Sequence, residues 1–281
     1  MVQEEKDLSL YVVATPIGNL LDMTQRAIQV LADVDVIAAE DTRHSKSLLK
    51  HYGISTPLIA FHDHNERTGS QPLIARMLKG DQVALISDAG TPLISDPGYQ
   101  LVRDAHAAAI QVIPIPGPTA MAAALSASGL ATDSFLFVGF LPSKLSARVA
   151  KLQTLRYYPF SLVFYEAPHR IDKSVSSMID VFGGQRKACI AREMTKTFEQ
   201  IVNGTLDELL AGLLSREIVS KGEFVVIVSG VTDNNVEFDD RTLLTHLLAE
   251  LPPSKAAALA HKLTGKPKKA FYELALVIKD E

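Results

Sequence analysis

Short apolar runs alternate with amphipathic stretches through the first half of the 281-residue chain, and this alternation constrains the fold more than any other feature. The runs are short, rich in β-branched residues and bounded by turn formers, which predicts buried strands. They span residues 10–14, 34–39, 57–61, 82–87 and 110–115. Because strands separated by helices pair in parallel through right-handed crossovers, the sequence predicts a parallel five-stranded sheet.

The intervening stretches have helical periodicity and recognisable end signals. Asp22 or Thr24 is placed to cap the first helix, Gly53 to end the second in a left-handed conformation, and Asp96 to cap the fourth. The four predicted helices cover residues 24–32, 44–52, 70–79 and 97–109.

The pattern of predicted elements differs in the second half of the chain, where several predicted strands follow one another closely. Such spacing indicates a mixed sheet with antiparallel members. The strands are expected at 134–140, 160–165, 187–191, 198–204 and 223–229. Helices are expected at 118–128, 144–156, 171–182 and 206–214. The fold class is therefore α/β, with two unlike α/β domains.

A polar, acidic stretch (VTDNNVEFDD) after Gly230 predicts a linker to a small C-terminal helical extension. Its helices are expected at 241–251, 254–264 and from 267 onward, with Ser254 as an N-cap and Gly265 as a C-terminal stop. We therefore predict an N-terminal domain at 8–118, a second domain at 119–232 and the extension at 238–281.

Composition excludes several classes of protein. Hydrophobic residues make up 47% of the chain, enough for a sizeable core, and the single cysteine, Cys189, rules out an intramolecular disulfide. The polar N-terminus lacks the features of a secretory signal and no apolar run approaches a membrane span, so we expect a cytoplasmic protein. A net charge of −4 argues against a globally basic nucleic-acid coat, although residues 255–272 contain five lysines and no acid.

In a parallel α/β sheet, ligands bind at the carboxyl ends of strands. The run Ser87–Gly98 (SDAGTPLISDPG) follows a buried strand and has the densest cluster of turn formers in the chain, more than a simple turn needs. The loop Thr15–Leu20 (TPIGNL) is not a dinucleotide fingerprint and is equally compatible with an ordinary turn. The run Pro116–Ala120 serves as a rigid interdomain joint, a ligand loop, or both.

Charged strand-end loops have two interpretations each. Glu40–Arg43 (EDTR) either handles substrate or places Asp41 or Thr42 as a helix cap beside a solvated Arg43. Glu166–Arg170 and Arg192–Lys196 form either a charged cleft or structural ion pairs. His62–Glu66 (HDHNE) has a spacing that suggests a metal, but no established metal motif accompanies it, and we expect no metal site.

Nucleophile motifs are absent from the sequence. It has no GxSxG elbow and no phosphate-binding loop with its lysine, and Cys189 falls inside a predicted strand. Covalent catalysis by serine or cysteine is therefore disfavoured.

Seven motifs occur in an order and spacing that resemble one family. They are TPIGNLLD, AAEDTRHSKSLL, LISDAGTPLISDPG, IPIPGPTA, FVGFLP, FYEAPHR and AREMTKTFE. The chain is similar over residues 8–281 to the RsmI family of 16S ribosomal RNA 2′-O-methyltransferases, in the tetrapyrrole-methylase-like class. The resemblance implies methylation of a cytidine ribose in the decoding region of the small (30S) subunit, S-adenosylmethionine in a cleft between two domains, and a homodimer.

The resemblance also implies which residues hold the cofactor. These are Pro16, Ser87, Asp88, Ala89, Gly90, Ile94, Ser95, Thr119, Ala120, Tyr165, Gly222, Glu223 and Phe224. Strand-end reasoning points to the same loops except the last segment, Gly222–Phe224.

A ribose hydroxyl gains from a base or a cationic neighbour as it loses its proton. The candidate acceptors are Glu40, Asp41, Glu166 and Glu193, and the candidate cations are Arg43, Lys144, Arg170 and Lys196, with no decisive base among them. We select Asp41, Arg43, Glu166 and Arg170 as the catalytic set, on the hypothesis that the EDTR and YEAPHR loops face each other across the substrate.

RNA binding by an acidic protein must depend on local patches. The predicted contacts are Lys144, Lys196, Lys255, Lys262, Lys266, Lys268 and Lys269. A stabilising or dimer-packing role for the C-terminal helices is the alternative. Two rival functions remain open: methylation of a tetrapyrrole or other small molecule by the same fold, and RNA binding without catalysis.

Overall fold

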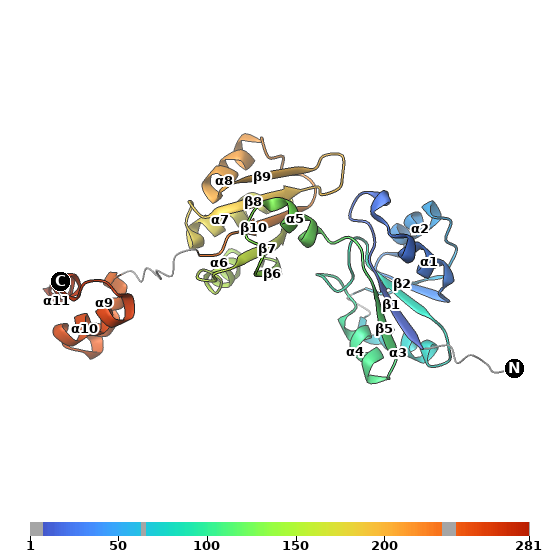
Figure 1. The fold of residues 1–281 in the computed structure, drawn as a ribbon, viewed down its shortest axis with the longest axis horizontal. Helices are drawn as coiled ribbons and strands as arrows, with labels where there is room; N and C mark the ends of the chain where they lie inside the picture. Colours follow the sequence, from blue (N-terminus) through green and yellow to red (C-terminus); the bar gives the residue numbers. More distant parts are fainter. Residues whose placement is uncertain (1–7, 63–65, 232–239, 281) are drawn as a thin grey trace. The chain divides into compact units, whose positions relative to one another are not determined.

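The computed structural model describes residues 8–62, 66–231 and 240–280. These fall into two compact units. One contains both sheets with their helices, and the other contains the C-terminal helices together with Tyr157–Pro159 (Figure 1). The predicted boundary at 118/119 falls between a strand and a helix, whereas residues 232 and 238 lie outside the described part, so the domain limits remain predictions.

The first sheet is parallel and five-stranded, as predicted, with the order β3-β2-β4-β1-β5. Its strands are β1 (Ser9–Val13), β2 (Val36–Ala39), β3 (Leu58–Ala60), β4 (Val83–Ile86) and β5 (Gln111–Ile115). Strands β2 and β4 are buried along their whole length, because helices cover both faces of the sheet.

Two apolar clusters fix those helices to the two faces. Helices α1 (Gln25–Asp33) and α2 (Thr42–His51) pack on one face through Leu31 and Leu49. Helices α3 (Glu66–Met77) and α4 (Tyr99–Ala107) pack on the other through Met77 and Leu101. Both faces are thus sealed, and the strand-end loops are left for ligand binding.

Helix ends show where local signals sufficed and where they failed. The Thr24 side chain accepts a hydrogen bond from the Ala27 N–H, and Gly53 and Gly265 adopt positive φ, as predicted. The predicted Asp96 cap is wrong: Gly98 is the N-cap of α4, and the Glu66 carboxylate accepts from the N–H groups of Gly98 and Gln100. Helix α3 starts at Glu66, four residues before its predicted start, and its first residue makes this tertiary contact.

The second sheet is mixed, as predicted, with the order β6-β7-β10-β8-β9. Strands β6 (Phe135–Phe140) and β7 (Ser161–Glu166) are parallel, while β8 (Lys187–Arg192), β9 (Gln200–Thr205) and β10 (Phe224–Val228) pair antiparallel. Helices α6 (Leu145–Gln153), α7 (Ile171–Phe182) and α8 (Leu206–Ser215) cover one face. Helix α5 (Ala120–Ser128) covers the other, where Leu125 packs among Val163 and Ile227.

Three short helices form the C-terminal unit: α9 (Asp240–Glu250), α10 (Pro253–Thr264) and α11 (Lys268–Asp280). Leu244, Ala257, Ala260 and Phe271 are buried among them, so this small unit has its own apolar core. The predicted Ser254 cap is wrong, because Pro252 is the N-cap and Pro253 occupies the first helical position, where proline costs no hydrogen bond. Among the described residues, no helix combines the length and apolar character needed to cross a membrane.

Candidate ligand pocket

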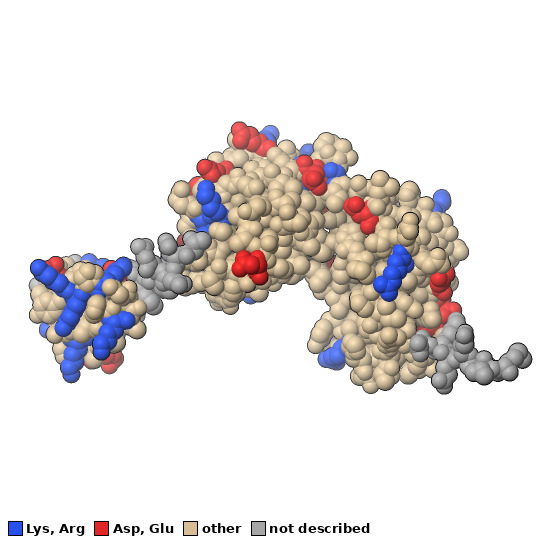
Figure 2. Space-filling view, viewed as in Figure 1, with Lys and Arg blue, Asp and Glu red and all other residues tan. Residues whose placement is uncertain are grey.

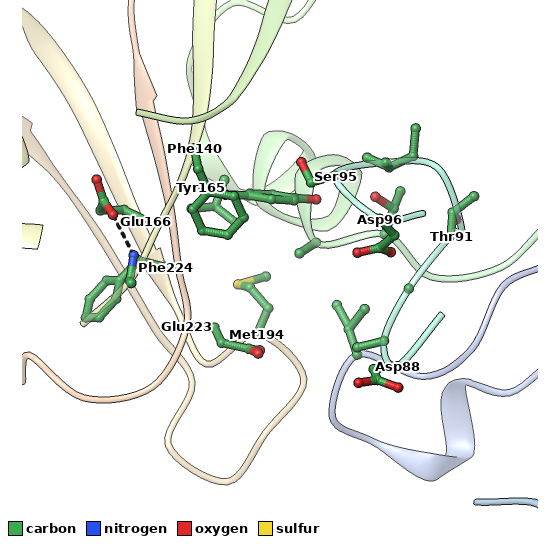
Figure 3. A pocket seen from close by; sticks show the side chains of 18 of the residues that line it. Asp88, Thr91, Ser95, Asp96, Phe140, Tyr165, Glu166, Met194, Glu223 and Phe224 are labelled. Atoms are coloured by element: carbon green, nitrogen blue, oxygen red, sulfur yellow. Dashed lines mark hydrogen bonds between the residues drawn. The ribbon is translucent and has the colours of Figure 1, made fainter. Parts of the chain in front are cut away.

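One cavity of the two-sheet unit, about 410 Å³ in volume, is lined by loops that leave the ends of strands in both sheets (Figure 3). This volume lies within the roughly 300–1,000 Å³ that ligand pockets occupy. The first sheet contributes Ile17, Glu40, Asp88, Ala89, Gly90, Thr91, Ile94, Ser95 and Asp96. The remaining lining residues are Thr119, Ala120, Phe140, Tyr165, Glu166, Ala167, Pro168, Met194, Glu223, Phe224 and Val225.

Backbone hydrogen bonds join the first and fourth strand-end loops into one wall. The Thr15 N–H donates to the Gly90 carbonyl at 2.8 Å, and the Gly90 N–H donates to the Thr15 carbonyl at 3.0 Å. Gly90 has φ +86°, and a Cβ there would lie 3.3 Å from a methyl of Ile17. Glycine is therefore required for both the conformation and the close approach.

The second strand-end loop is fixed to the same wall through Asp88. The Asp41 N–H donates to the Asp88 carboxylate at 3.0 Å, and the Asp88 N–H lies 3.5 Å from the Glu40 carboxylate. The EDTR and SDAG loops are therefore held side by side, although they are 47 residues apart in sequence.

Left-handed backbone at residues other than glycine is concentrated in two pocket loops. Leu93 and Ser95 have φ values of 71° and 72° in the SDAGTPLISDPG run, and Glu193 and Thr195 have 50° and 66° after β8. This conformation costs about 1–2 kcal/mol per residue and persists only where the surrounding structure enforces it. Such strain is often found where a loop is shaped for a ligand.

Aromatic side chains from the second sheet form the opposite wall. The Tyr165 ring makes edge-to-face contacts with Phe137 and Phe140, at centroid distances of 4.9 and 5.7 Å. Its hydroxyl accepts a hydrogen bond from the Met121 N–H at 3.2 Å, and burial raises the pKa of Tyr165. Figure 3 shows Tyr165 and Met194 projecting into the cavity, toward the wall that carries Asp88, Thr91 and Asp96.

Glu166 is a hydrogen-bonded carboxylate of the lining, and its side chain is 1% exposed. It accepts from the Arg170 guanidinium at 2.6 Å, from the Ser174 hydroxyl at 2.5 Å and from the Ala167 N–H at 2.7 Å. Glu166 and Arg170 therefore form an ion pair within this loop. The network fixes the turn that places Ala167 and Pro168 against the cavity.

A second ion-pair network includes Glu223 of the lining. The Lys196 ammonium donates to Glu193 and Glu223, both at 2.9 Å. Burial acts to raise the pKa of Glu193. Hydrogen bonds from Lys196 and from the Glu223 backbone outweigh burial and hold this pKa below its ordinary value. The Lys196 stem lies over Gly18, where a Cβ would overlap its Cγ, and the Asn19 N–H donates to the Thr195 hydroxyl at 3.1 Å. The TPIGNL loop thus packs against the loop after β8.

The pocket lining is acidic. Glu40, Asp88, Asp96, Glu166 and Glu223 contribute carboxylates, and none of the lining residues named above is lysine or arginine. Glu166 is paired with Arg170, and Glu223 with Lys196. This charge favours a ligand with cationic groups and disfavours a polyanion such as a nucleoside triphosphate.

Ten of the thirteen predicted cofactor residues line this cavity, namely Asp88, Ala89, Gly90, Ile94, Ser95, Thr119, Ala120, Tyr165, Glu223 and Phe224. The other three, Pro16, Ser87 and Gly222, adjoin it in sequence. Ser87 is buried, and its carbonyl accepts from the Thr15 hydroxyl at 3.2 Å. A Cβ on Gly222 would overlap Glu193, so this glycine makes room for the Glu193–Lys196 network. Ligand contact by these residues remains a prediction.

The predicted catalytic residues are less uniformly placed. Glu166 lines the cavity, whereas Asp41, Arg43 and Arg170 are not among the lining residues. Asp41 caps α2 by accepting from the Arg43 N–H at 2.8 Å, and the Arg43 side chain is 90% exposed. The structure thus has the helix cap and solvated arginine that were the alternative for this loop.

The predicted RNA contacts lie in both units. Lys144 is the exposed N-cap of α6, and Lys196 is held by the two carboxylates described above. In the C-terminal unit, Lys255, Lys262, Lys268 and Lys269 are exposed, and Lys266 pairs with Asp240 at 3.0 Å. Figure 2 shows lysine and arginine side chains gathered over this unit.

Sequence reasoning did not select several lining residues: Ile17, Thr91, Asp96, Phe140, Ala167, Pro168, Met194 and Val225, with Glu40 named only as an acceptor. Most lie inside the motifs quoted above, so the signal was present. Phe140 and Met194 look like ordinary apolar residues in sequence, and only the fold turns them toward the cavity.

Two other candidate chemistries have little support. Cys189 is fully buried in β8, and burial raises its pKa to about 11, which suppresses the reactive thiolate. Within the described residues, no three potential ligands gather as a metal site, and residues 63–65 of the HDHNE loop lie outside them.

Two five-stranded sheets, each covered by helices, with a ligand-sized pocket lined by their strand-end loops define a class, that of two-sheet α/β proteins with a ligand pocket. Two solved structures share this fold: a uroporphyrin-III-C-methyltransferase from Thermus thermophilus (TM-score 0.57, 19% identity, 80% of this chain and 95% of that one) and a diphthine synthase (TM-score 0.58, 14% identity, 79% and 90%).

Family models and relatives narrow the class. Residues 9–210 match Tetrapyrrole (Corrin/Porphyrin) Methylases, and residues 236–279 match the RsmI C-terminal HTH domain. Proteins named Ribosomal RNA small subunit methyltransferase I are 52% identical in Pseudomonas aeruginosa (95% of this chain, 96% of that one) and 49% identical in Escherichia coli O157:H7 (95% and 94%). The chain belongs to this family of methyltransferases, as its motifs predicted.

Proposed function

We propose that this protein transfers a methyl group from S-adenosylmethionine to the 2′-hydroxyl of a cytidine in the decoding region of 16S ribosomal RNA. The observation that carries the proposal is the extent of the similarity. Identity of about 50% to small-subunit RNA methyltransferases covers nearly the whole chain, including the C-terminal helices that match their own family model. An enzyme for a small molecule would not need that extension.

The pocket suits S-adenosylmethionine in charge and in shape. This cofactor carries a sulfonium and an ammonium group, which the Asp88, Asp96 and Glu223 carboxylates would offset. Tyr165 and Phe140 would offer aromatic surface to its adenine, and the Ala89–Gly90 backbone would permit close approach. The residues present therefore fit the cofactor.

The bound cofactor would supply an activated methyl group, and the protein's task is then mainly alignment, which lowers barriers by about 7–11 kcal/mol in favourable cases. Glu166 and Arg170 fix the loop after β7 that borders the cavity, while Asp41 and Arg43 follow the end of β2 in the first sheet. We assign these four residues to positioning the ribose and easing loss of its proton, with no single base among them.

The C-terminal lysines are the proposed contacts to RNA phosphates. Lys255, Lys262, Lys268 and Lys269 are exposed on α10 and α11, and no acid occurs between residues 255 and 272. Phosphate contacts release counterions, so affinity should fall steeply with salt. We place the reaction on the 30S subunit in the cytoplasm and propose a homodimer, in line with the family resemblance.

A methyl-transfer assay with labelled cofactor tests the function. Assembled 30S subunits, free 16S RNA and a porphyrinogen are offered in parallel, and the modified nucleoside is identified by mass spectrometry after nuclease digestion. Label in 2′-O-methylcytidine from ribosomal RNA is the expected result. Label in the porphyrinogen would contradict the proposal, and calorimetry showing no cofactor binding would favour a non-catalytic RNA-binding protein.

A further inference from the structure

A second hollow of the two-sheet unit lies on the outer face of the second sheet's helices. This groove, about 590 Å³ in volume, runs between α6, α7 and α8. It is lined by Ser143, Leu145, Arg148, Asp172, Lys173, Ser176, Ser177, Asp180, Leu210 and Leu214. None of the proposed cofactor or catalytic residues lies in it.

Arg148 is the unusual residue of this groove. It is only 5% exposed, yet no described carboxylate lies within 4.0 Å of its guanidinium. Its Nε donates to the Ser177 hydroxyl at 3.0 Å, and its Nη1 donates to the Ser143 carbonyl at 3.1 Å. Both acceptors are neutral. A buried guanidinium without a counter-charge is costly, and an anion in the groove would compensate it.

Two helix N-termini open at the same groove. The N-cap residues of α6 and α7, Lys144 and Arg170, make no side-chain capping hydrogen bond. The first N–H groups of a helix have no acceptor within the helix, and they favour an anion together with the helix dipole. Because β6 and β7 are parallel, both helices begin at the same edge of the sheet.

The same sheet edge also borders the candidate ligand pocket that Tyr165 and Asp88 line. Phe140 lines the pocket and precedes Ser143 by three residues, so the two Cα atoms are at most about 11 Å apart. Pro168 lines the pocket, and Lys173 of the groove follows it by five residues. The phosphates next to a ribose held at the pocket would therefore lie within reach of the groove.

The groove is not uniformly basic. Asp172 and Asp180 of α7 also line it, one helical turn to either side of Ser176. Their negative charges oppose the positive charges of Arg148 and Lys173. Lys144 is exposed beside it at the start of α6. The two aspartates would moderate anion affinity, which suits a substrate that must be released after turnover.

We propose that Arg148, Lys173, Lys144 and the N-termini of α6 and α7 form a subsite for a phosphodiester of the substrate RNA, adjacent to the reacting nucleotide. The inference rests on the proposed function, because it requires an RNA substrate. It assigns to the catalytic unit a phosphate contact separate from the C-terminal lysines.

Steady-state methylation of 30S subunits by Arg148→Gln and Lys173→Ala variants tests the subsite. The glutamine introduced by Arg148→Gln retains hydrogen bonding without charge, and Lys173 is exposed, so its truncation spares the fold. We expect KM for 30S subunits to rise about tenfold for Arg148→Gln and several-fold for Lys173→Ala, with little change in kcat or in cofactor affinity by calorimetry. The slope of log affinity against log salt should decrease by about one for each charge removed.

Matched controls separate the subsite from general charge. Lys151→Ala removes an exposed lysine of α6 that does not line the groove and should leave KM unchanged. Asp180→Asn removes an opposing charge and should lower KM. Unchanged KM and salt slope in folded Arg148→Gln and Lys173→Ala proteins, with an active wild type, would overturn the subsite alone. A wild type that does not methylate 30S subunits would overturn the proposed function and the subsite with it.

Discussion

The EDTR and YEAPHR loops look alike in sequence, since each places a carboxylate and then an arginine after a buried strand, yet the fold treats them differently. The Asp41–Arg43 pair lies at the surface, with its arginine side chain 90% exposed, while the Glu166 side chain is 1% exposed beside Arg170. Exposed ion pairs contribute little to stability, whereas breaking a buried ion pair leaves one charge unpaired and poorly solvated. The same residue types thus cap a helix in one place and hold a pocket wall in the other.

A third cluster, Glu193–Lys196–Glu223, is intermediate between these extremes. The Lys196 side chain is 28% exposed, Glu193 is more buried and Glu223 is mostly exposed. If burial decides the role of a charged pair, substitutions in the three clusters should rank in the order of their burial.

The largest effect is expected for Glu166→Ala. It leaves the half-buried Arg170 without its partner and removes the acceptor of Ser174 and the Ala167 N–H, which should cost about 3 kcal/mol in the free energy of unfolding. Denaturant unfolding measures the loss, and methyl transfer should fall with it. The double variant Glu166→Leu with Arg170→Met removes both charges and should recover part of the stability. A Glu166→Ala protein as stable as wild type would contradict the claim that burial decides the role of these charged pairs.

An intermediate effect is expected for Lys196→Met, which frees Glu193 and the pocket-lining Glu223. We expect a stability loss of about 1 kcal/mol and a several-fold weaker affinity for S-adenosylmethionine, measured by calorimetry. Gly18→Ala should act in the same direction, because its Cβ would displace the Lys196 stem.

Lys221→Met provides the control for this cluster, since Lys221 is an exposed neighbour without an ion pair among the described contacts. Equal cofactor affinity in the Lys196→Met and Lys221→Met proteins would show that Lys196 does not support the pocket.

The smallest effect is expected for Asp41→Asn, and it should depend on pH. Hydrogen bonds from the Arg43 side chain and backbone lower the pKa of Asp41 from 3.8 to about 2. A lowered folded-state pKa stabilises the protein above pH 3.8, and that contribution disappears as pH falls toward 2. The difference in Tm between wild type and variant should therefore be small at pH 5 and shrink further by pH 2.5. A constant difference over this range would show that Asp41 acts only as a cap, a role that an asparagine side chain also fills.

Sequence reasoning succeeded where the determining interactions are local. Apolar periodicity predicted the strands and helices, and Thr24 and Gly265 marked helix ends because their roles depend only on neighbouring backbone. It failed for Asp96 and Ser254: a carboxylate from another helix supplies the first cap, and a proline displaces the second. Long-range partners cannot be identified from spacing alone.

For the site, the sequence alone determined the loops and the family. The order of the seven motifs identified the strand ends that bring ten predicted residues to one cavity. Only the tertiary structure decided which charges are buried: it held Glu166 in a network, left Arg43 exposed, and buried Arg148 with neutral hydrogen-bond acceptors. The physical reason is that a charge's energetic role depends on its solvation and partners, which packing fixes and residue type does not.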